Sequence, residues 1–169
     1  KDERTIKAKS LNIEFVSANP TGPLHLAHGR GAVVGDVLSN LYEFNGYKVN
    51  REYHVNNTGN QINEFLSSIL FTISEKYNLS LPFNQFYKGE YIKEIADSCY
   101  LKFKNLININ ISNDQKNQIV NFAIKNLVTK SLSVLKSTNI HFNSVIYETE
   151  IMNKDHFSKA LSILKKDNL

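Results

Sequence analysis

The chain has 169 residues, 41% hydrophobic and 21% charged, a composition that fits one compact unit or two small ones. Its single cysteine, Cys99, excludes a disulfide framework and a thiolate metal site, and it favours a reducing compartment. The formal net charge of +4 is compatible with a polyanionic partner, and no apolar run is long enough to cross a membrane.

The chain opens on a charged segment and then a strand. Residues 1–10 lack any periodicity, so we interpret them as a linker. Leu11–Val16 is short, apolar and β-branched, which is the pattern of a buried strand, and alternation places Glu14 on the face opposite to Ile13 and Phe15. Glu14 is therefore either a solvent-facing residue of an edge strand or an acceptor for a guanidinium, which a carboxylate binds through two hydrogen bonds.

A turn with two prolines leads from this strand into a helix. Pro20 and Pro23 fix φ and disfavour a helix before Leu24, and Asn45-Gly46 supplies a left-handed stop. Between them, apolar residues recur at a helical spacing, and these are Val34, Val37, Leu38 and Leu41.

One ridge of the helix carries only small residues, among them glycines, which a helix interior normally avoids. Ala27, Gly31 and Gly35 fall four apart and share one ridge. A glycine in a helix interior costs about 1 kcal/mol relative to alanine. We therefore expect the close approach of a backbone or a ligand along this ridge.

His25 and His28 are three residues apart in the first helical turn and so face the same side. The start of a helix presents free N–H groups and a partial positive charge, which favour a phosphate. Two imidazoles there can donate hydrogen bonds to phosphate oxygens as negative charge builds in a transition state. A His-rich helix cap or a pair of metal ligands has the same spacing, so the spacing alone leaves all three possibilities open.

A second strand follows the helix. Tyr47–Val55 alternates, and strand–helix–strand predicts a right-handed βαβ unit in a parallel sheet. Ligands of such sheets bind beyond the carboxyl ends of the strands, so we expect the loops at 17–28 and 56–61 to face one site. Asn56–Gly59 can also be only a helix entry, and we expect His54 to be packed or exposed without a chemical role.

The rest of the chain is mainly helical. Ile62, Phe65 and the apolar residues that follow at helical spacing predict an amphipathic helix, and Ser112–Gln115 has the form of a capping box. The elements expected are helices at 60–77, 90–105, 114–137 and 155–166, a loop at 78–88 whose Phe83, Phe86 and Tyr87 cover a core, and a strand at 140–148.

Three segments together carry a resemblance to a known family. Residues 17–36, with His25-Leu26-Ala27-His28 in the place of the class I His-x-Gly-His motif, resemble the ATP-site segment of bacterial-type arginyl-tRNA synthetase, a class I aminoacyl-tRNA synthetase. Residues 47–62 are similar to its second strand and Asn-Asp-x-Gly-x-Gln turn, and residues 87–92 to its Tyr-x-Gly-x-Tyr-Ile element. The detailed match covers residues 11–62, with thinner similarity beyond.

The resemblance implies an α/β fold, namely half of the Rossmann-like nucleotide-binding fold of a class I synthetase. A parallel βαβ unit would occupy residues 11–62, and a mainly helical connective insertion with a strand near 140–148 would occupy residues 63–169. A tRNA-binding domain would precede the linker. The second half of the nucleotide fold, with its Lys-Met-Ser-Lys-Ser loop, and the anticodon-binding domain would lie outside the chain.

The resemblance also implies the reaction. The whole enzyme would activate arginine with ATP to arginyl-adenylate and transfer the arginyl group to the 3′ end of tRNA(Arg), with Mg²⁺ accompanying ATP and no metal bound by the protein itself. The implied catalytic residues are His25 and His28, and the implied ATP-binding residues are His25, Ala27, His28, Gly29 and Gly31. Arginine would bind to Glu14 through its guanidinium and to Ser17 and Asn19 through its backbone end, and a further site loop would contain Asn56, Gly59 and Gln61.

The chain departs from the family pattern at three positions. Ala27 replaces the glycine of the motif, so one methyl group intrudes where the nucleotide comes close, and we expect weakened but tolerated binding. Asn57 stands where the family usually has aspartate, and Gly22 stands where many relatives have a lysine. We expect a cytoplasmic monomer without membrane attachment, and because Asn, Lys and Ile are abundant, an organelle of an A/T-rich eukaryote is the second expectation.

Two other functions compete with this interpretation. A small nucleotidyltransferase of the same His-x-Gly-His superfamily would need a compact single-domain sheet, which the helical second half argues against. A non-catalytic paralogue would bind only tRNA or a partner protein. Neither alternative predicts an arginine site at Glu14 and Asn19, so arginine binding separates them from a synthetase.

Overall fold

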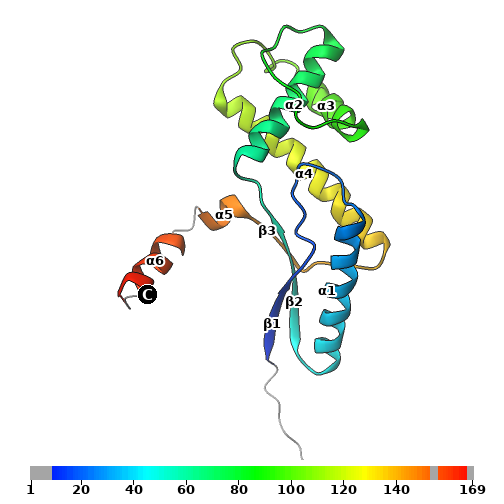
Figure 1. The fold of residues 1–169 in the computed structure, drawn as a ribbon, viewed down its shortest axis with the longest axis vertical. Helices are drawn as coiled ribbons and strands as arrows, with labels where there is room; N and C mark the ends of the chain where they lie inside the picture. Colours follow the sequence, from blue (N-terminus) through cyan, green and yellow to red (C-terminus); the bar gives the residue numbers. More distant parts are fainter. Residues whose placement is uncertain (1–8, 153–155, 167–169) are drawn as a thin grey trace, which may run out of the picture. The chain divides into compact units, whose positions relative to one another are not determined.

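The structure, a computed structural model, describes residues 9–152 and 156–166, so most of the expected linker lies outside the described residues (Figure 1). The chain divides into two compact units. The sheet unit comprises Lys1–Asn19, Leu24–Asn56 and Leu132–Leu169, and the helical unit comprises Pro20–Pro23 and Asn57–Ser131.

The sheet unit contains the predicted parallel βαβ arrangement (Figure 1). Three parallel strands lie in the order β1-β2-β3, so β2 is central and β1 has a neighbour on one side among the described residues. Glu14 of β1 is paired with Glu52 of β2 in the register, and Glu52 with Ser144 of β3. The elements of this unit are β1 (Ser10–Glu14), α1 (Leu26–Phe44), β2 (Lys48–Val55), β3 (Ser144–Tyr147), α5 (Glu148–Met152) and α6 (His156–Lys166).

The first strand ends two residues earlier than its apolar pattern predicts. Val16 and Ser17 adopt φ values of 66° and 39°, in the left-handed region that β-branched and bulky residues avoid. The Ser17 N–H donates to the Phe15 carbonyl at 2.9 Å, which closes a tight γ-turn around Val16. The chain therefore leaves the sheet through a strained turn of the kind that gathers at functional sites.

Helix α1 is confirmed, but its apolar stripe is not the face that packs on the sheet. The buried residues of α1 are Ala32, Gly35 and Ser39. A Cβ at position 35 would overlap the ring of Phe15, so only a small-residue face allows the helix to lie this close to β1. The apolar residues at the predicted spacing are 42–61% exposed, and they are Val34, Val37, Leu38 and Leu41.

The expected close approach along the ridge of α1 is therefore confirmed at one position. Gly35 meets Phe15, whereas a Cβ at Gly31 would meet nothing within 4 Å. Ser39 is fully buried, and its hydroxyl donates to the Gly35 carbonyl at 2.7 Å, so this buried polar group has a hydrogen-bond partner. The packing of α1 against Phe15 thus depends on the absence of a side chain at Gly35 and on the hydrogen bond of Ser39 within the helix.

Aromatic rings fill the space between the sheet and the loop that follows β1. The rings of Phe15 and Phe142 lie 4.6 Å apart between centroids, and those of Tyr53 and Phe142 lie 5.3 Å apart and edge-on. Phe15 and Tyr53 lie on the sheet face toward α1, so the alternation of the strands places Glu14 and Glu52 on the opposite face.

The helical unit contains α2 (Asn60–Tyr77), α3 (Glu90–Phe103) and the first part of α4 (Asn113–Ser137) (Figure 1). The bounds of α2 are those predicted, and all six predicted core residues are buried, namely Ile62, Phe65, Leu66, Ile69, Leu70 and Ile73. Cys99 of α3 is fully buried, and burial raises the pKa of its thiol to about 12, so this cysteine packs as a small apolar residue.

The capping box that opens α4 is confirmed in both directions. The Ser112 N–H donates to Gln115 Oε1 at 2.8 Å, and the Gln115 N–H donates to Ser112 Oγ at 3.3 Å. After α4, the predicted strand at 140–148 is shorter than expected, since β3 spans only Ser144–Tyr147. Glu148 begins α5, a helix that the pattern did not predict. Among the described residues, no helix combines the length and the apolar character that a membrane crossing requires.

Candidate functional site

The loop that leaves β1 is fastened to the neighbouring strand β2. The backbone N–H of His54 donates to Ser17 Oγ at 3.1 Å. The Ala18 backbone forms a hydrogen bond with the hydroxyl of Tyr53, whose pKa is raised chiefly by burial. These contacts fix Ser17 at the carboxyl ends of β1 and β2, the edge where ligands of parallel sheets bind.

The two histidines come together at the start of α1, as their spacing predicts. Their ring centroids lie 3.8 Å apart. His25 is the extended residue that precedes the helix, and its backbone N–H donates to Nδ1 of His28 at 3.2 Å. Because Nδ1 of His28 accepts this bond, the neutral ring carries its proton on Nε2, which is then a donor for a ligand.

The environment keeps His28 uncharged near neutral pH. Partial burial and then the electrostatic effect of the neighbouring His25 lower the pKa of His28 below its ordinary value of 6.5. His25 is exposed and His28 is half-buried, so neither imidazole is turned into the interior. A neutral donor at a helix N-terminus suits a phosphate oxygen on which charge develops during a reaction.

Open space surrounds the start of α1. A Cβ at Gly29 or Gly31 would meet nothing within 4 Å, and the side chain of Ala27 is exposed. A cavity of about 410 Å³ adjoins His25 within the sheet unit. It is lined by Leu24, His25, Gly29, Ala32, Val33, Val134, Leu135, Thr138 and Ile140.

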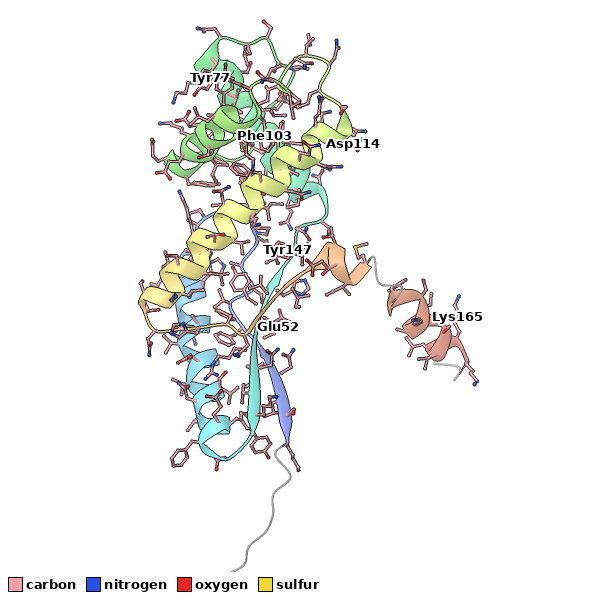
Figure 2. The ribbon with its side chains drawn as sticks, turned by 180° about the vertical axis from the view of Figure 1, so that it is seen from behind. Glu52, Tyr77, Phe103, Asp114, Tyr147 and Lys165 are labelled. Atoms are coloured by element: carbon pink, nitrogen blue, oxygen red, sulfur yellow. The ribbon has the colours of Figure 1, made fainter. Side chains whose placement is uncertain are left out.

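Glu14 is exposed at the carboxyl end of β1, the edge strand of the described sheet, and Asn19 is also exposed. Glu52, the partner of Glu14 in the strand register, lies on the same face of the sheet as Glu14. Figure 2 labels Glu52 on the central strand. Two carboxylates directly opposite one another repel, so a cation between them would be stabilising. Glu52 is a site candidate that the sequence reasoning missed, although it lies within the segment 47–62.

The loop after β2 is a helix entry. Gly59 precedes α2 with a φ of 83°, a conformation that favours glycine, and the side-chain amide of Gln61 donates to the Thr58 carbonyl at 3.5 Å. Asn56 belongs to the sheet unit, whereas Gly59 and Gln61 belong to the helical unit. A chemical role for these three residues stays a prediction.

His54 has a partner that the sequence did not reveal. Its Nε2 lies 2.7 Å from Oε2 of Glu148, the first residue of α5. The two residues are 94 positions apart, so no local pattern connects them. The pair holds the carboxyl end of β2 beside α5, directly next to the hydrogen bond that positions Ser17.

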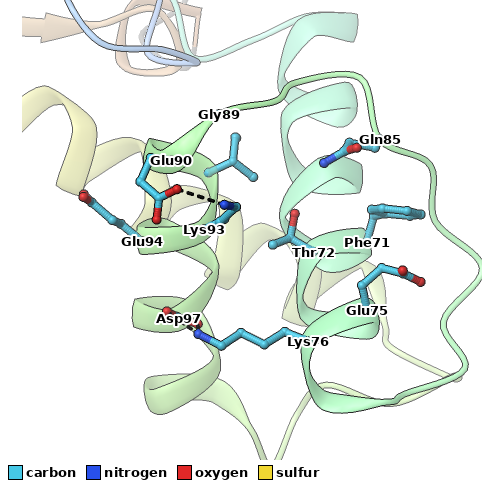
Figure 3. A pocket seen from close by; sticks show the side chains of 11 residues that line it. Phe71, Thr72, Glu75, Lys76, Gln85, Gly89, Glu90, Lys93, Glu94 and Asp97 are labelled. Carbon is cyan, nitrogen blue, oxygen red and sulfur yellow. Dashed lines mark hydrogen bonds and ion pairs between the residues drawn. The ribbon is translucent and has the colours of Figure 1, made fainter.

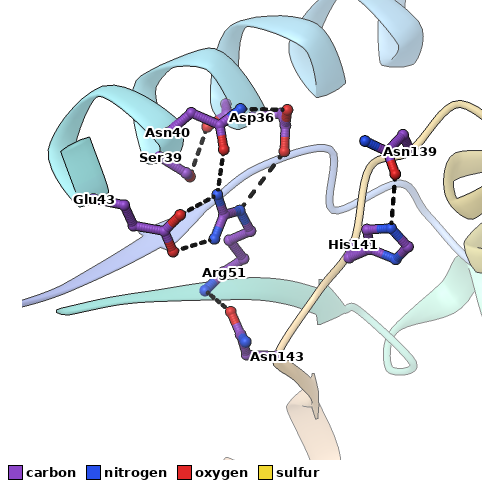
Figure 4. A network of polar contacts seen from close by, with 9 residues as sticks. Asp36, Ser39, Asn40, Glu43, Arg51, Asn139, His141 and Asn143 are labelled. Atoms are coloured by element: carbon purple, nitrogen blue, oxygen red, sulfur yellow. Dashed lines mark hydrogen bonds and ion pairs between the residues drawn. The ribbon is translucent and has the colours of Figure 1, made fainter.

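Arg51 ties β2 to α1 on the other face of the sheet, as Figure 4 shows. Its guanidinium binds both carboxylate oxygens of Glu43, at 2.5 and 3.0 Å, and also Asn40 at 2.8 Å. These hydrogen bonds raise the pKa of Arg51 and lower that of Glu43. In the same region, Nε2 of His141 lies 3.3 Å from Asn139 Oδ1.

Metal binding was one of the possibilities that the spacing of the histidines left open. Within the ranges 9–152 and 156–166, no three or more His, Cys, Asp or Glu residues are arranged to hold a metal ion. His25 and His28 therefore lack a third protein ligand in this part of the chain.

Comparison with known proteins agrees with the resemblance. The family model described as tRNA synthetases class I (R), catalytic domain, matches residues 1–169. The arginine–tRNA ligase of Anaplasma phagocytophilum is 35% identical over 160 residues, 94% of this chain and 27% of its own length. That of Pelagibacter ubique is 39% identical over 171 residues, 96% of this chain and 29% of its own length.

Solved structures give the same result. A crystal structure described as an arginyl-tRNA synthetase from Campylobacter jejuni matches with a TM-score of 0.78 at 36% identity, over 95% of this chain and 35% of that one. The Thermus thermophilus arginyl-tRNA synthetase shares the fold, with a TM-score of 0.60 at 16% identity, over 95% of this chain and 27% of its own. This chain thus spans between about a quarter and a third of the length of the proteins that it matches. It belongs to the family of class I tRNA synthetase catalytic domains of the arginyl type.

Proposed function

We propose that this chain forms the part of an arginyl-tRNA synthetase that binds ATP and arginine for adenylate formation. The observation that carries the proposal is the histidine pair at the start of α1, where His28 is a neutral donor near Gly29 and Gly31, whose Cβ positions are unobstructed. Relatives named arginine–tRNA ligase, which match 94–96% of this chain, support the substrate.

In the reaction, the carboxylate of arginine attacks the α-phosphate of ATP in line, and the bond to pyrophosphate breaks. His25 and His28 would donate hydrogen bonds to phosphate oxygens as negative charge spreads over them. Gly29 and Gly31 leave room for the nucleotide, and the methyl group of Ala27 restricts it slightly. Mg²⁺ would arrive with the ATP phosphates and neutralise part of their charge.

Arginine would bind across the carboxyl end of β1. Glu14, with Glu52 beside it, would take the guanidinium, while Ser17 and Asn19 would take the backbone end. The oxygen of Ser17 already accepts the His54 N–H, so its hydroxyl proton is available to the arginine carboxylate. Asn56, Gly59 and Gln61 stay candidate ligand-binding residues within this proposal.

The remaining parts of the proposal concern the whole protein. tRNA(Arg) would be the second substrate, and the protein would act as a cytoplasmic monomer. We keep the division into a nucleotide-fold half at 11–62 and a connective insertion at 63–169 as a proposal. Residues 63–131 would be the compact core of the insertion, because they belong to a unit whose helices have their own buried residues.

Calorimetric titration with arginine tests the proposal. We expect Glu14→Gln to weaken arginine binding about 10- to 100-fold, because a hydrogen-bonded charge contributes about 1.5–3 kcal/mol. The control Glu75→Gln makes the same change on an exposed residue of the helical unit and should leave the affinity unchanged. Absence of arginine binding by the unaltered chain would count against an arginine site in this part of the synthetase, and equal affinity of the two variants would overturn the role of Glu14.

A further inference from the structure

A groove of about 350 Å³ lies on the helical unit between the end of α3 and the middle of α4. Figure 2 labels Phe103 beside α4 at this end of α3. The residues of α4 that line it recur at intervals of three or four and so share one face of the helix. The lining consists of Lys102, Phe122, Lys125, Asn126, Thr129 and Lys130.

Lys102 is held in the groove by aromatic rings rather than by a carboxylate. Its Nζ lies 4.2 Å from the ring centroid of Phe122 and 5.4 Å from that of Phe103. The two rings pack edge-on with centroids 5.5 Å apart. Cation–π contacts of this kind fix an ammonium group without neutralising it, so Lys102 keeps its full charge for a ligand.

The groove has more cations than anions. Lys130 forms an ion pair with Glu94 at 2.7 Å. For Lys102 and Lys125, no ion pair with a carboxylate occurs in the part of the chain that the structure describes. The groove is therefore lined by two lysines that have no carboxylate partner in the described part of the chain.

The neighbouring surface of the same unit is different. A cavity of about 500 Å³ between α2 and α3 is lined by two lysines and four carboxylates (Figure 3). There Lys76 pairs with Asp97 at 2.6 Å and Lys93 with Glu90 at 2.9 Å. In the α2–α3 cavity, carboxylates thus outnumber the lysines and both lysines are paired, unlike in the α3–α4 groove.

We propose that the α3–α4 groove binds the phosphate backbone of RNA through Lys102 and Lys125. Lysine ammonium groups act as point charges for phosphate, and such contacts position a nucleic acid without reading its sequence. The hydroxyl of Thr129 and one amide N–H of Asn126 donate to carbonyls of their own helix. The identity of the RNA rests on the proposed function, under which the ligand is tRNA(Arg).

Fluorescence anisotropy with a labelled tRNA(Arg) transcript, from 50 to 200 mM KCl, tests the groove. The double variant Lys102→Gln/Lys125→Gln should lose about tenfold in affinity and lower the slope of log K against log salt by about 1.4–1.8, because each phosphate contact contributes about 0.7–0.9. The control Lys76→Gln/Lys93→Gln removes the same charge from the α2–α3 cavity and should bind as the unaltered chain does. Equal losses in both variants, or no RNA binding at all, would overturn the proposal.

Two further measurements keep the outcome specific. Poly-L-glutamate of matched charge should bind much more weakly than the transcript; equal binding, with the same loss in the Lys102/Lys125 variant, would replace RNA by acidic proteins as the partner class. Arginine affinity, measured by calorimetry, should be identical in the Lys102/Lys125 variant and the unaltered chain. Failure of arginine binding in the unaltered chain would count against the proposed function, while the anisotropy result alone decides the groove.

Discussion

The histidine pair at the start of α1 makes the chemistry of single residues sensitive to pH. Burial and the electrostatic effect of His25 hold the pKa of His28 below 6.5 in the folded protein. As the pH falls through 6.5, the unfolded chain binds a proton at this residue before the folded chain does. As far as His28 is concerned, the folded protein is therefore most stable above pH 6.5 and loses stability as the pH falls below this value. The loss stops once the pH lies below the folded pKa, because His28 is then protonated in both states.

This pH dependence can be measured with the variant His28→Gln, which removes the titrating group. Urea denaturation at pH 7.5 and pH 5.5 should show that the unaltered chain loses more stability on acidification than the variant does. An NMR titration of the unaltered chain should place the midpoint of His28 below 6.5, and His25→Gln should move it upward. A midpoint at or above 6.5 would contradict the assignment of His28 as a neutral donor.

At the scale of elements, the contact between α1 and β1 depends on the missing side chain at Gly35. Gly35→Ala would force a methyl group into the ring of Phe15, and overpacking of this kind costs about 1–3 kcal/mol. Gly31→Ala is the matched control on the same helix, because its Cβ meets nothing within 4 Å. Higher helix propensity should make that variant more stable by about 0.5–1 kcal/mol.

Urea denaturation of the two alanine variants, with circular dichroism to verify the helix content, measures these opposite effects. If both alanines stabilised the chain, the close approach of Phe15 to α1 would be wrong. If both destabilised it, the open space at Gly31 would be wrong. Neither position takes part in the test of arginine binding, so the stability measurement stands by itself.

At the scale of the whole molecule, the chain corresponds to between about a quarter and a third of each relative. In its described part, β1 is paired on one side, and α1 exposes an apolar stripe whose Val37 and Leu41 are 51% and 54% exposed. Both surfaces are of the kind that further packing covers in a complete catalytic domain.

We therefore expect the 169-residue chain to bind arginine or ATP weakly and to catalyse no arginine-dependent exchange between ATP and pyrophosphate. A polypeptide of the relatives' full length should support exchange, because the 169 residues correspond to only 27–35% of the matched proteins. Exchange of labelled pyrophosphate into ATP, with and without arginine, measures the difference. Arginine-dependent exchange by the chain alone would show that the described residues form a complete active site.

The sequence by itself determined all the described helices except α5, the parallel βαβ arrangement and the pairing of His25 with His28. These features depend on neighbours within about one helical turn, or on an apolar period, both of which are written along the chain. The bounds of α2 and the reciprocal hydrogen bonds of Ser112 and Gln115 agree with prediction for this reason. The family resemblance likewise rests on contiguous segments.

Only the tertiary structure decided which surfaces meet. The Phe15 ring selects the small-residue face of α1 for burial, against the apolar stripe that periodicity emphasises. His54 finds Glu148 across 94 residues, and Glu52 comes beside Glu14 only through the strand register. Contacts of this kind depend on how distant segments pack, and a local pattern carries no information about a partner that folding brings from elsewhere.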